Sequence, residues 1–290
     1  MDKRFFLLFL MGCLVCKWSF PISSIRQEAQ KESYSYPRVE IKDTELRTLK
    51  SKHNGQNYSI NIFFPTDYKK EGRRYPAVYV LDAEYNFGCV AYIARRLIKN
   101  GDVPKILLIG VAYDTDYEDF YIKRFRDSTP ESRIHGRNSG GAEKFTQFIE
   151  KELIPFIDQK YRTIPGDRAI VGHSITGFFG CYVLFRHPGL FNRYVIVSPS
   201  LWFSDGIVFE YEEKFATNRS ELEASVYLAV GADESQRMKD GALRLNDTLL
   251  KREYSHLKFH FSLVEGENHR SLFPFAFTRG LRFIFSGNAP

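Results

Sequence analysis

The chain has 290 residues, of which 43% are hydrophobic and 26% charged, and its formal net charge is +6. These proportions are typical of an ordinary globular protein and exclude a disordered, collagen-like or coiled-coil chain. Lysine and arginine residues are spread along the sequence rather than clustered, so the positive charge does not indicate nucleic-acid binding. The length fits one large α/β domain.

The first 20 residues resemble a secretory signal peptide. Lys3 and Arg4 give a positive start, and residues 5–16 form an apolar run too short to span a bilayer comfortably. The sequence Leu-Met-Gly-Cys at 10–13 also resembles a lipobox, in which Cys13 would carry a lipid anchor; cleavage shortly after Trp18 is the alternative. We therefore expect an exported protein, periplasmic or secreted, in which residues 21–37 form a polar tether and residues 38–287 a single domain.

Beyond the tether, alternating or continuous apolar runs predict strands, and apolar residues at helical spacing predict helices. Strands 39–49 and 58–64 flank a His-Asn-Gly-Gln turn and predict an antiparallel hairpin. Residues 113–140 lack clear periodicity and are predicted to be one long functional loop. The further predicted strands are 75–81, 106–112, 169–172, 194–197, 226–230 and 257–264, and the predicted helices are 87–99, 141–161, 175–186, 208–218, 235–254 and 272–285. This alternation predicts an α/β fold with a mostly parallel twisted sheet, helices on both faces and an antiparallel N-terminal hairpin.

Ser174 lies at the joint between a predicted strand and a predicted helix. Gly172 precedes it by two residues and Gly177 follows it by three. This layout is typical of a nucleophile elbow, in which a sharp turn raises the serine hydroxyl above the end of the sheet. The usual pattern places the second glycine one residue earlier, where this chain has Thr176. A β-branched side chain there would crowd the neighbouring strand unless Gly177 relieves it.

An acid and a histidine follow later strands in the order expected for an α/β-hydrolase triad. Asp233 and Glu234 follow the strand at 226–230, and His269 follows the strand at 257–264. His269 would take the proton from Ser174, and the acid would orient the imidazole. We expect Glu234 to be the triad acid and Asp233 to cap the next helix.

Each of these residues taken alone has a simpler interpretation, because a serine at such a joint is usually an N-cap and a lone loop histidine usually lies on the surface. The hypothesis therefore depends on the three residue types occurring together and in order. Attack on an ester also needs two N–H donors for the oxyanion. We expect the backbone amides of Ile175 and Glu84 to supply them, with Ala83 as the alternative to Glu84.

Seven segments carry a resemblance to a known family. They are YPAVYVLDAEYNF (75–87), PKILLIGVAY (104–113), RFRDSTP (124–130), GGAEKFTQFIEKELIPFIDQKYR (140–162), VGHSITG (171–177), FNRYVIVSPSLWF (191–203) and EGENHRSL (265–272). The chain resembles the esterase D-like family of the α/β-hydrolase superfamily, particularly the bacterial branch that includes ferric-siderophore hydrolases. The resemblance implies a three-layer sandwich and a serine hydrolase of carboxylic esters, with Ser174 as nucleophile, His269 as base, and no metal or organic cofactor.

The resemblance also implies substrate contacts. Residues 198–202 would line the acyl or alcohol side of the pocket, and Trp202 would stack on an aromatic ring or simply pack in the core. Arg126 would contact the substrate or form a structural ion pair with Asp127. Ala83 replaces a glycine common in the family, which would tighten the oxyanion loop.

The expected substrate is a small-molecule ester: a siderophore, a small acyl ester or an ester linked to a carbohydrate. An acyltransferase on the same fold and a non-catalytic ligand-binding module are the alternatives. No nucleic acid is expected as a partner, and a membrane only through the N-terminal anchor. Cys89 and Cys181 fit no zinc pattern and are expected to be unpaired, although a disulfide between them is the alternative.

Overall fold

The computed structural model describes residues 40–287, apart from residues 71, 114, 116 and 132–137. The predicted signal peptide, the tether and Cys13 lie outside the described residues. Ile41–Pro290 form one compact unit. Among the residues that are described, no helix combines the length and the apolar character needed to cross a bilayer.

The unit is built on an eight-stranded sheet with the strand order β1-β2-β4-β3-β5-β6-β7-β8. The pairs β1–β2 and β2–β4 are antiparallel, and every other neighbouring pair is parallel. The strands are β1 (Thr44–Lys50), β2 (Asn57–Phe63), β3 (Tyr75–Val80), β4 (Leu107–Tyr113), β5 (Thr163–His173), β6 (Arg193–Val197), β7 (Glu221–Gly231) and β8 (Ser255–Val264). The predicted fold class is therefore confirmed, including the antiparallel N-terminal hairpin.

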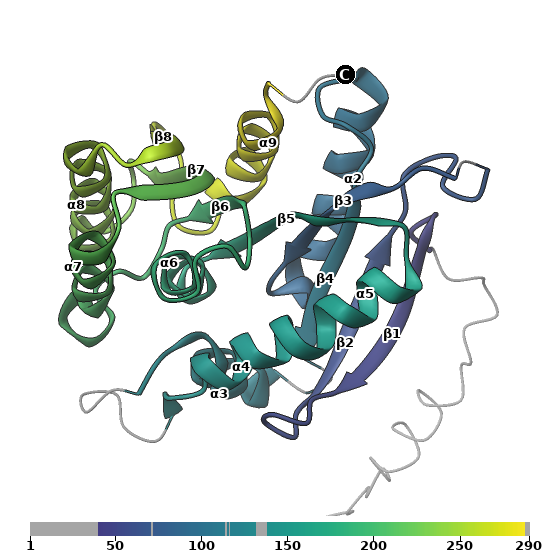
Figure 1. Ribbon diagram of the computed structural model, residues 1–290, viewed down its shortest axis with the longest axis horizontal. Helices are drawn as coiled ribbons and strands as arrows, with labels where there is room; N and C mark the ends of the chain where they lie inside the picture. Colours follow the sequence, from purple (N-terminus) through teal and green to yellow (C-terminus); the bar gives the residue numbers. More distant parts are fainter. Residues whose placement is uncertain (1–39, 71, 114, 116, 132–137, 288–290) are drawn as a thin grey trace, which may run out of the picture. The chain divides into compact units, whose positions relative to one another are not determined.

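Successive residues of the central strands point to opposite faces of the sheet and therefore pack in two separate hydrophobic cores. Val78 packs with α2 (Ala83–Asn100) and α9 (Leu272–Phe285) on one face, whereas the next residue, Tyr79, packs in the core of the other face. That second core includes α5 (Ile154–Lys160), α6 (Ile175–Arg186), α7 (Ile207–Asn218) and α8 (Gln236–Arg252). Both layers are visible in Figure 1. Burial on two faces explains why the strand sequences read as continuous apolar runs.

The prediction of one loop over residues 113–140 is wrong for its first half, because Tyr117–Ser128 form helix α3. The sequence of α3 is highly charged, and this hides its helical period. Asp127 is fully buried on α3 and accepts hydrogen bonds from Tyr58 Oη at 2.6 Å and Arg126 Nε at 2.7 Å. Charged side chains that pair with other parts of the chain can face the interior, and hydrophobic periodicity does not detect them.

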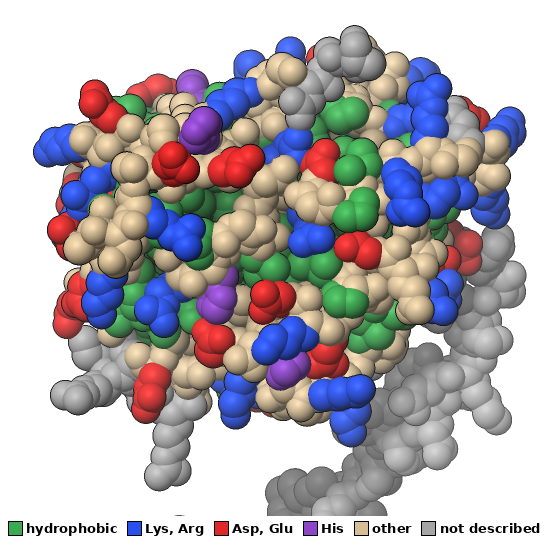
Figure 2. Space-filling model, in the orientation of Figure 1, with side chains coloured by type: hydrophobic (Ala, Val, Ile, Leu, Met, Phe, Trp, Pro, Cys, Tyr) green, Lys and Arg blue, Asp and Glu red, His purple; other side chains and the backbone are tan. Residues whose placement is uncertain are grey.

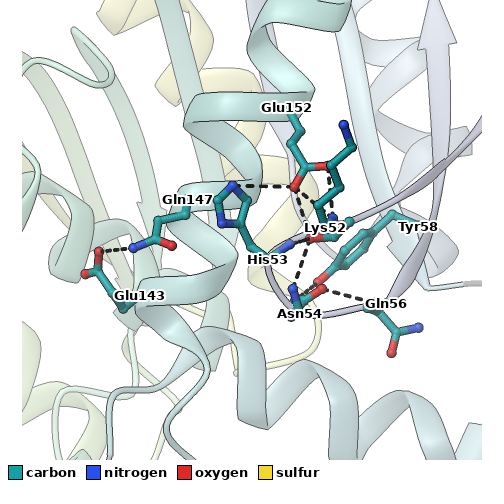
Figure 3. Close-up of polar contacts among 9 residues, drawn as sticks. Lys52, His53, Asn54, Gln56, Tyr58, Glu143, Gln147 and Glu152 are labelled. Carbon is teal, nitrogen blue, oxygen red and sulfur yellow. Dashed lines mark hydrogen bonds and ion pairs between the residues drawn. The ribbon is translucent and has the colours of Figure 1, made fainter.

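The predicted helix at 141–161 is a run of three helical segments. α4 (Ala142–Phe148) leads into a π-helical turn, Ile149–Leu153, and then into α5, which carries Pro155 in its first turn. Pro155 has no N–H to donate, and it follows directly on the π-helical turn, where the α-helical hydrogen-bond pattern is already interrupted. Glu152 in the π turn accepts the backbone N–H of Lys52 at 3.0 Å and fastens the β1–β2 turn to the helices (Figure 3).

Charge is mixed over the surface. In the face seen in Figure 2, lysine and arginine side chains alternate with acidic ones and with small apolar patches. Arg252, for example, binds Glu212 at 2.8 Å and Glu213 at 2.5 Å. The excess of basic residues is thus distributed and partly neutralised.

Cys89 and Cys181 are free thiols. Cys89 belongs to α2 and Cys181 to α6, and these helices cover opposite faces of the sheet. Burial raises the pKa of the Cys181 thiol well above its ordinary value. The expected absence of a disulfide between them is therefore confirmed.

Candidate active site

The nucleophile elbow is the joint between β5 and α6. Ser174 has φ 62° and ψ −119°, a backbone conformation that is unfavourable for any residue with a Cβ. Its N–H donates to the Val197 carbonyl at 2.9 Å, which fixes the turn against the end of β6. Strand and helix approach so closely that a Cβ on Gly172 would lie 2.2 Å from the Thr176 carbonyl oxygen.

The second close approach is at Gly177, where a Cβ would lie 2.9 Å from the Val197 carbonyl oxygen. Glycine is therefore required at 177, the position it occupies in this chain. Thr176 is buried, but its hydroxyl lies 2.8 Å from the Asp82 carboxylate and 2.9 Å from the His173 amide. The threonine thus lies in a polar environment that satisfies its hydroxyl.

A carboxylate and an imidazole meet beyond the ends of β7 and β8. Glu234 is buried, and its Oε2 lies 2.8 Å from His269 Nδ1. Asp233 is exposed, and the N-cap of α8 is Ser235, so Asp233 neither faces His269 nor caps the helix. Of the two acids, only Glu234 makes a hydrogen bond with the histidine.

The other oxygen of Glu234 is held by two further donors. Ser198 Oγ lies 2.5 Å from Glu234 Oε1, and the Gly231 amide donates to the same atom at 2.9 Å. Burial acts to raise the pKa of Glu234, but the hydrogen bonds from His269, Ser198 and Gly231 outweigh it and lower that pKa. The carboxylate is therefore kept ionised, as an acid that orients a histidine must be.

Ser198 is a residue that sequence reasoning placed elsewhere. It was expected on the pocket wall, whereas the structure turns its hydroxyl toward Glu234. Its position directly after β6, at the same sheet end as the other groups, was the available signal. A serine next to Pro199 at a strand end gives no indication of which neighbour its hydroxyl will bind.

Ser174 opens onto a cavity of about 480 Å³. Its Oγ lies 3.4 Å from Ser200 Oγ, and that is its side-chain hydrogen bond within the described part of the chain. The cavity walls are largely aromatic or aliphatic and include one cation; the lining residues are Tyr121, Ile122, Arg124, Phe125, Asn138, Ser174, Ile175, Ser200 and Trp202. The structure therefore opens the hydroxyl to a space lined by apolar rings.

His173 packs beside the site. Its ring centroid lies 4.6 Å from that of His269, and its buried Nε2 has no hydrogen-bond partner among the residues that the structure describes. Burial, with the neighbouring His269 second, lowers the pKa of His173 to about 4. His173 is consequently a neutral ring at ordinary pH.

The expected oxyanion donors lie at two helix N-termini. Ile175 is the first residue of α6, and Ala83 and Glu84 are the first two residues of α2. N–H groups in a first turn lack intrahelical acceptors and point toward an incoming anion. The carboxylate of Glu84 interacts with its own amide and accepts the amide of Tyr113, so the Ala83 amide is the less engaged of the two.

The two arginines of the Arg-Phe-Arg-Asp sequence on α3 have different surroundings. Arg124 lines the cavity, whereas Arg126 pairs with Asp127 at 2.7 Å and is not among the cavity residues. Residues two apart on a helix face different directions, which explains the division. Trp202 does line the cavity, and the guanidinium of Arg237 lies 4.1 Å from the centre of its ring.

No three histidine, cysteine or acidic side chains within the described ranges gather as a metal site would require.

Comparison with known proteins identifies the family. Residues 51–284 match the family described as "Putative esterase". The ferri-bacillibactin esterase BesA of Bacillus subtilis is 32% identical over 86% of this chain and 92% of its own length. The siderophore triacetylfusarinine C esterase of Aspergillus fumigatus is 26% identical over 80% of this chain and 89% of its own length.

A solved structure supports the same family. The crystal structure of BES protein from Bacillus cereus superposes with a TM-score of 0.78 at 32% identity, covering 86% of this chain and 97% of that chain. The chain therefore belongs to this esterase family of the α/β-hydrolase fold. It is a serine hydrolase of carboxylic esters.

Proposed function

We propose that this protein hydrolyses the ester bonds of a siderophore, with Ser174 as nucleophile, His269 as general base and Glu234 as the acid that orients His269. The observation that carries the catalytic assignment is the 2.8 Å hydrogen bond between Glu234 Oε2 and His269 Nδ1, at the same sheet end as the strained Ser174. Because Nδ1 is engaged by the carboxylate, Nε2 of His269 is left as the proton acceptor.

The reaction follows from these roles. Ser174 Oγ attacks the ester carbonyl carbon while His269 takes its proton. The amides of Ile175 and of Glu84 or Ala83 donate to the resulting oxyanion. Collapse of the tetrahedral intermediate breaks the bond to the alcohol oxygen, which receives the proton from His269. Water then repeats the sequence on the acyl-enzyme, and the carboxylic acid is released.

The walls of the cavity favour an aromatic substrate. Tyr121, Phe125 and Trp202 line the cavity together with Ser174. Aromatic rings of this kind can stack on catechol groups. The named activities of BesA and the Aspergillus fumigatus enzyme support the same substrate class.

The test compares three esters with the wild-type protein and the Ser174→Ala variant. The substrates are the ferric complex of a cyclic tris-catecholate triester, p-nitrophenyl acetate and a feruloylated sugar, with products separated by chromatography. We expect kcat/KM for the siderophore to exceed that for the sugar ester by at least about tenfold, and Ser174→Ala to abolish turnover.

The outcomes separate the alternatives. Turnover of the sugar ester above that of the siderophore would contradict the substrate assignment. Accumulation of a transesterified product in the presence of an acceptor alcohol, at the expense of the free acid, would indicate an acyltransferase. No Ser174-dependent turnover, together with no labelling by a fluorophosphonate, would indicate a binding module.

A further inference from the structure

Thr176 occupies the elbow position where glycine is usual, and its hydroxyl is engaged on two sides. It lies 2.8 Å from Asp82 Oδ2 and accepts the His173 amide at 2.9 Å. The hydroxyl also lies 2.9 Å from the His173 carbonyl oxygen. It has one proton to give, and a carboxylate is a stronger acceptor than a carbonyl, so the proton points to Asp82. One side chain therefore links the residue before Ser174 to the residue before α2.

Asp82 is the other end of this link. It is buried, and it has the left-handed backbone conformation φ 56°, ψ 41° directly before Ala83. Its two carboxylate oxygens bind Arg124 Nε and Nη2, each at 2.7 Å. Such a bidentate pair fixes the carboxylate in orientation as well as position.

Arg124 closes the network. Its Nη2 also donates to the His173 carbonyl at 3.0 Å. Both backbone polar groups of His173 are thereby held, the N–H by Thr176 and the carbonyl by Arg124. These contacts act on two backbone positions that are unfavourable for non-glycine residues, Asp82 and Ser174, and such conformations persist only where the surroundings impose them.

We propose that Thr176, Asp82 and Arg124 form a positioning network that sets the distance between the two halves of the oxyanion hole. The inference rests on the proposed function, because it assumes that the Ile175 amide and an amide at the start of α2 bind the oxyanion. The Thr176 hydroxyl joins the Ser174–Ile175 turn to the Asp82–Ala83 turn, and a displacement of either amide weakens donation to a charge that develops in the transition state. Thr176 and Asp82 are not among the cavity residues. Arg124 does line the cavity, but its Nε and Nη2 are bound to Asp82 and to the His173 carbonyl, so the network acts through the backbone.

The experiment compares Thr176→Val, which removes the hydroxyl at nearly constant shape, with Thr176→Ser, which keeps it. For p-nitrophenyl acetate we expect Thr176→Val to lower kcat by about tenfold with little change in KM, and Thr176→Ser to retain most of the wild-type kcat. The rate of labelling by a fluorophosphonate should fall in parallel, because that reaction uses the same oxyanion donors.

A matched control separates positioning from stability. Thr146 on α4 is also buried, and its hydroxyl binds the Ala142 carbonyl at 2.8 Å. Thr146→Val should lower Tm but leave kcat unchanged. Assays are made well below the Tm of each variant, so that loss of folded protein does not enter the comparison.

The two proposals fail in different ways. Wild-type kcat in a folded Thr176→Val variant, with Ser174→Ala inactive, would overturn the network and leave the catalytic assignment intact. Failure of Thr176→Ser to rescue kcat would also overturn the role of the hydroxyl. Absence of Ser174-dependent turnover in the wild-type protein would instead overturn the proposed function.

Discussion

Glu234 is held by more than its histidine. Hydrogen bonds from Ser198 and the Gly231 amide keep its carboxylate in place and help to lower its pKa. A carboxylate with several donors stays ionised at ordinary pH and presents a fixed acceptor to the imidazole. His269 can therefore be oriented by a group that has little freedom of its own.

This arrangement distinguishes the two acids after β7. Glu234→Ala should lower kcat by about a thousandfold, because the histidine loses its orienting partner. Asp233→Ala, at an exposed position one residue away, should stay within about twofold of the wild-type kcat. Ester hydrolysis by the two purified variants, normalised to folded protein, checks both values. A large loss of kcat in Asp233→Ala alone would show that Asp233, and not Glu234, is the acid.

His173 makes stability depend on pH. An unfolded histidine takes up a proton near pH 6.5, whereas the pKa of folded His173 is about 4. As pH falls below about 6.5 the unfolded state binds the proton first, so stability is lost until the folded state also titrates near pH 4. Between about pH 7 and about pH 5 this one residue should remove about 2 kcal/mol from the free energy of unfolding.

Urea unfolding of the wild-type protein and His173→Gln at the two pH values measures the contribution. His173→Gln should lose about 2 kcal/mol less than the wild-type protein on acidification. His260→Gln, on the exposed face of the edge strand β8, serves as the control and should retain the wild-type pH dependence. Equal acid sensitivity of wild type and His173→Gln would contradict the assignment.

Sequence reasoning anticipated the meeting of Glu234 and His269, because both follow strands that end at the same edge of a parallel sheet. It could not separate the roles of Arg124 and Arg126, since which arginine faces the cavity depends on how α3 packs. Nor could it place the hydroxyls of Ser198 and Thr176. Each depends on acceptors more than 30 residues away, and no local pattern encodes such a partner.

Helix α6 is constrained differently at its two glycines. Gly177 faces the Val197 carbonyl and Pro199 Cα, which are backbone atoms that cannot move aside, whereas Gly180 faces side-chain atoms of Ile196, the nearest being Cγ1 at 3.4 Å. The helix start is therefore pressed against the sheet, and its second turn is not.

Gly177→Ala should destabilise the protein by about 2 kcal/mol or more and reduce kcat, because the added Cβ forces α6 away from β6. Gly180→Ala should be neutral or stabilising by up to about 1 kcal/mol, because alanine favours helix and the contact is ordinary. Chemical denaturation and ester hydrolysis of the two variants give the comparison. Equal effects at both positions would show that the close approach at Gly177 is not a constraint.

Helix boundaries were predictable where a start or stop signal or a strong apolar period marked them. The helix at 175–186 coincides with α6, which lies between the elbow serine and the His-Pro-Gly sequence at 187–189, and the amphipathic helix at 272–285 coincides with α9. The failure at α3 has the opposite cause, since Asp127 is buried there with Tyr58 and Arg126 as its hydrogen-bond partners. Hydrophobic periodicity identifies helices that bury apolar side chains and misses those that bury ion pairs.

Every residue assigned to the proposed site lies within the unit Ile41–Pro290, on separate segments that meet at one edge of a single sheet. A chain beginning at residue 40 should consequently fold and hydrolyse p-nitrophenyl acetate with kcat/KM within about twofold of the full chain. Thermal unfolding and steady-state kinetics of both proteins make the test. Loss of the cooperative transition in the shorter chain would mean that preceding residues contribute to the folded domain.

The positive φ of Ser174 has one more consequence. A serine in that conformation costs about 1 kcal/mol or more relative to glycine, and alanine carries the same strain because it also has a Cβ. Ser174→Gly and Ser174→Ala should both be inactive, yet only the glycine variant should gain stability, by about 1 kcal/mol in urea unfolding. Equal stabilities would argue against strain at the elbow. A gain in Ser174→Gly would mean that the requirement for turnover keeps this protein less stable than its fold allows. The inactive variant would then unfold less readily than the active protein.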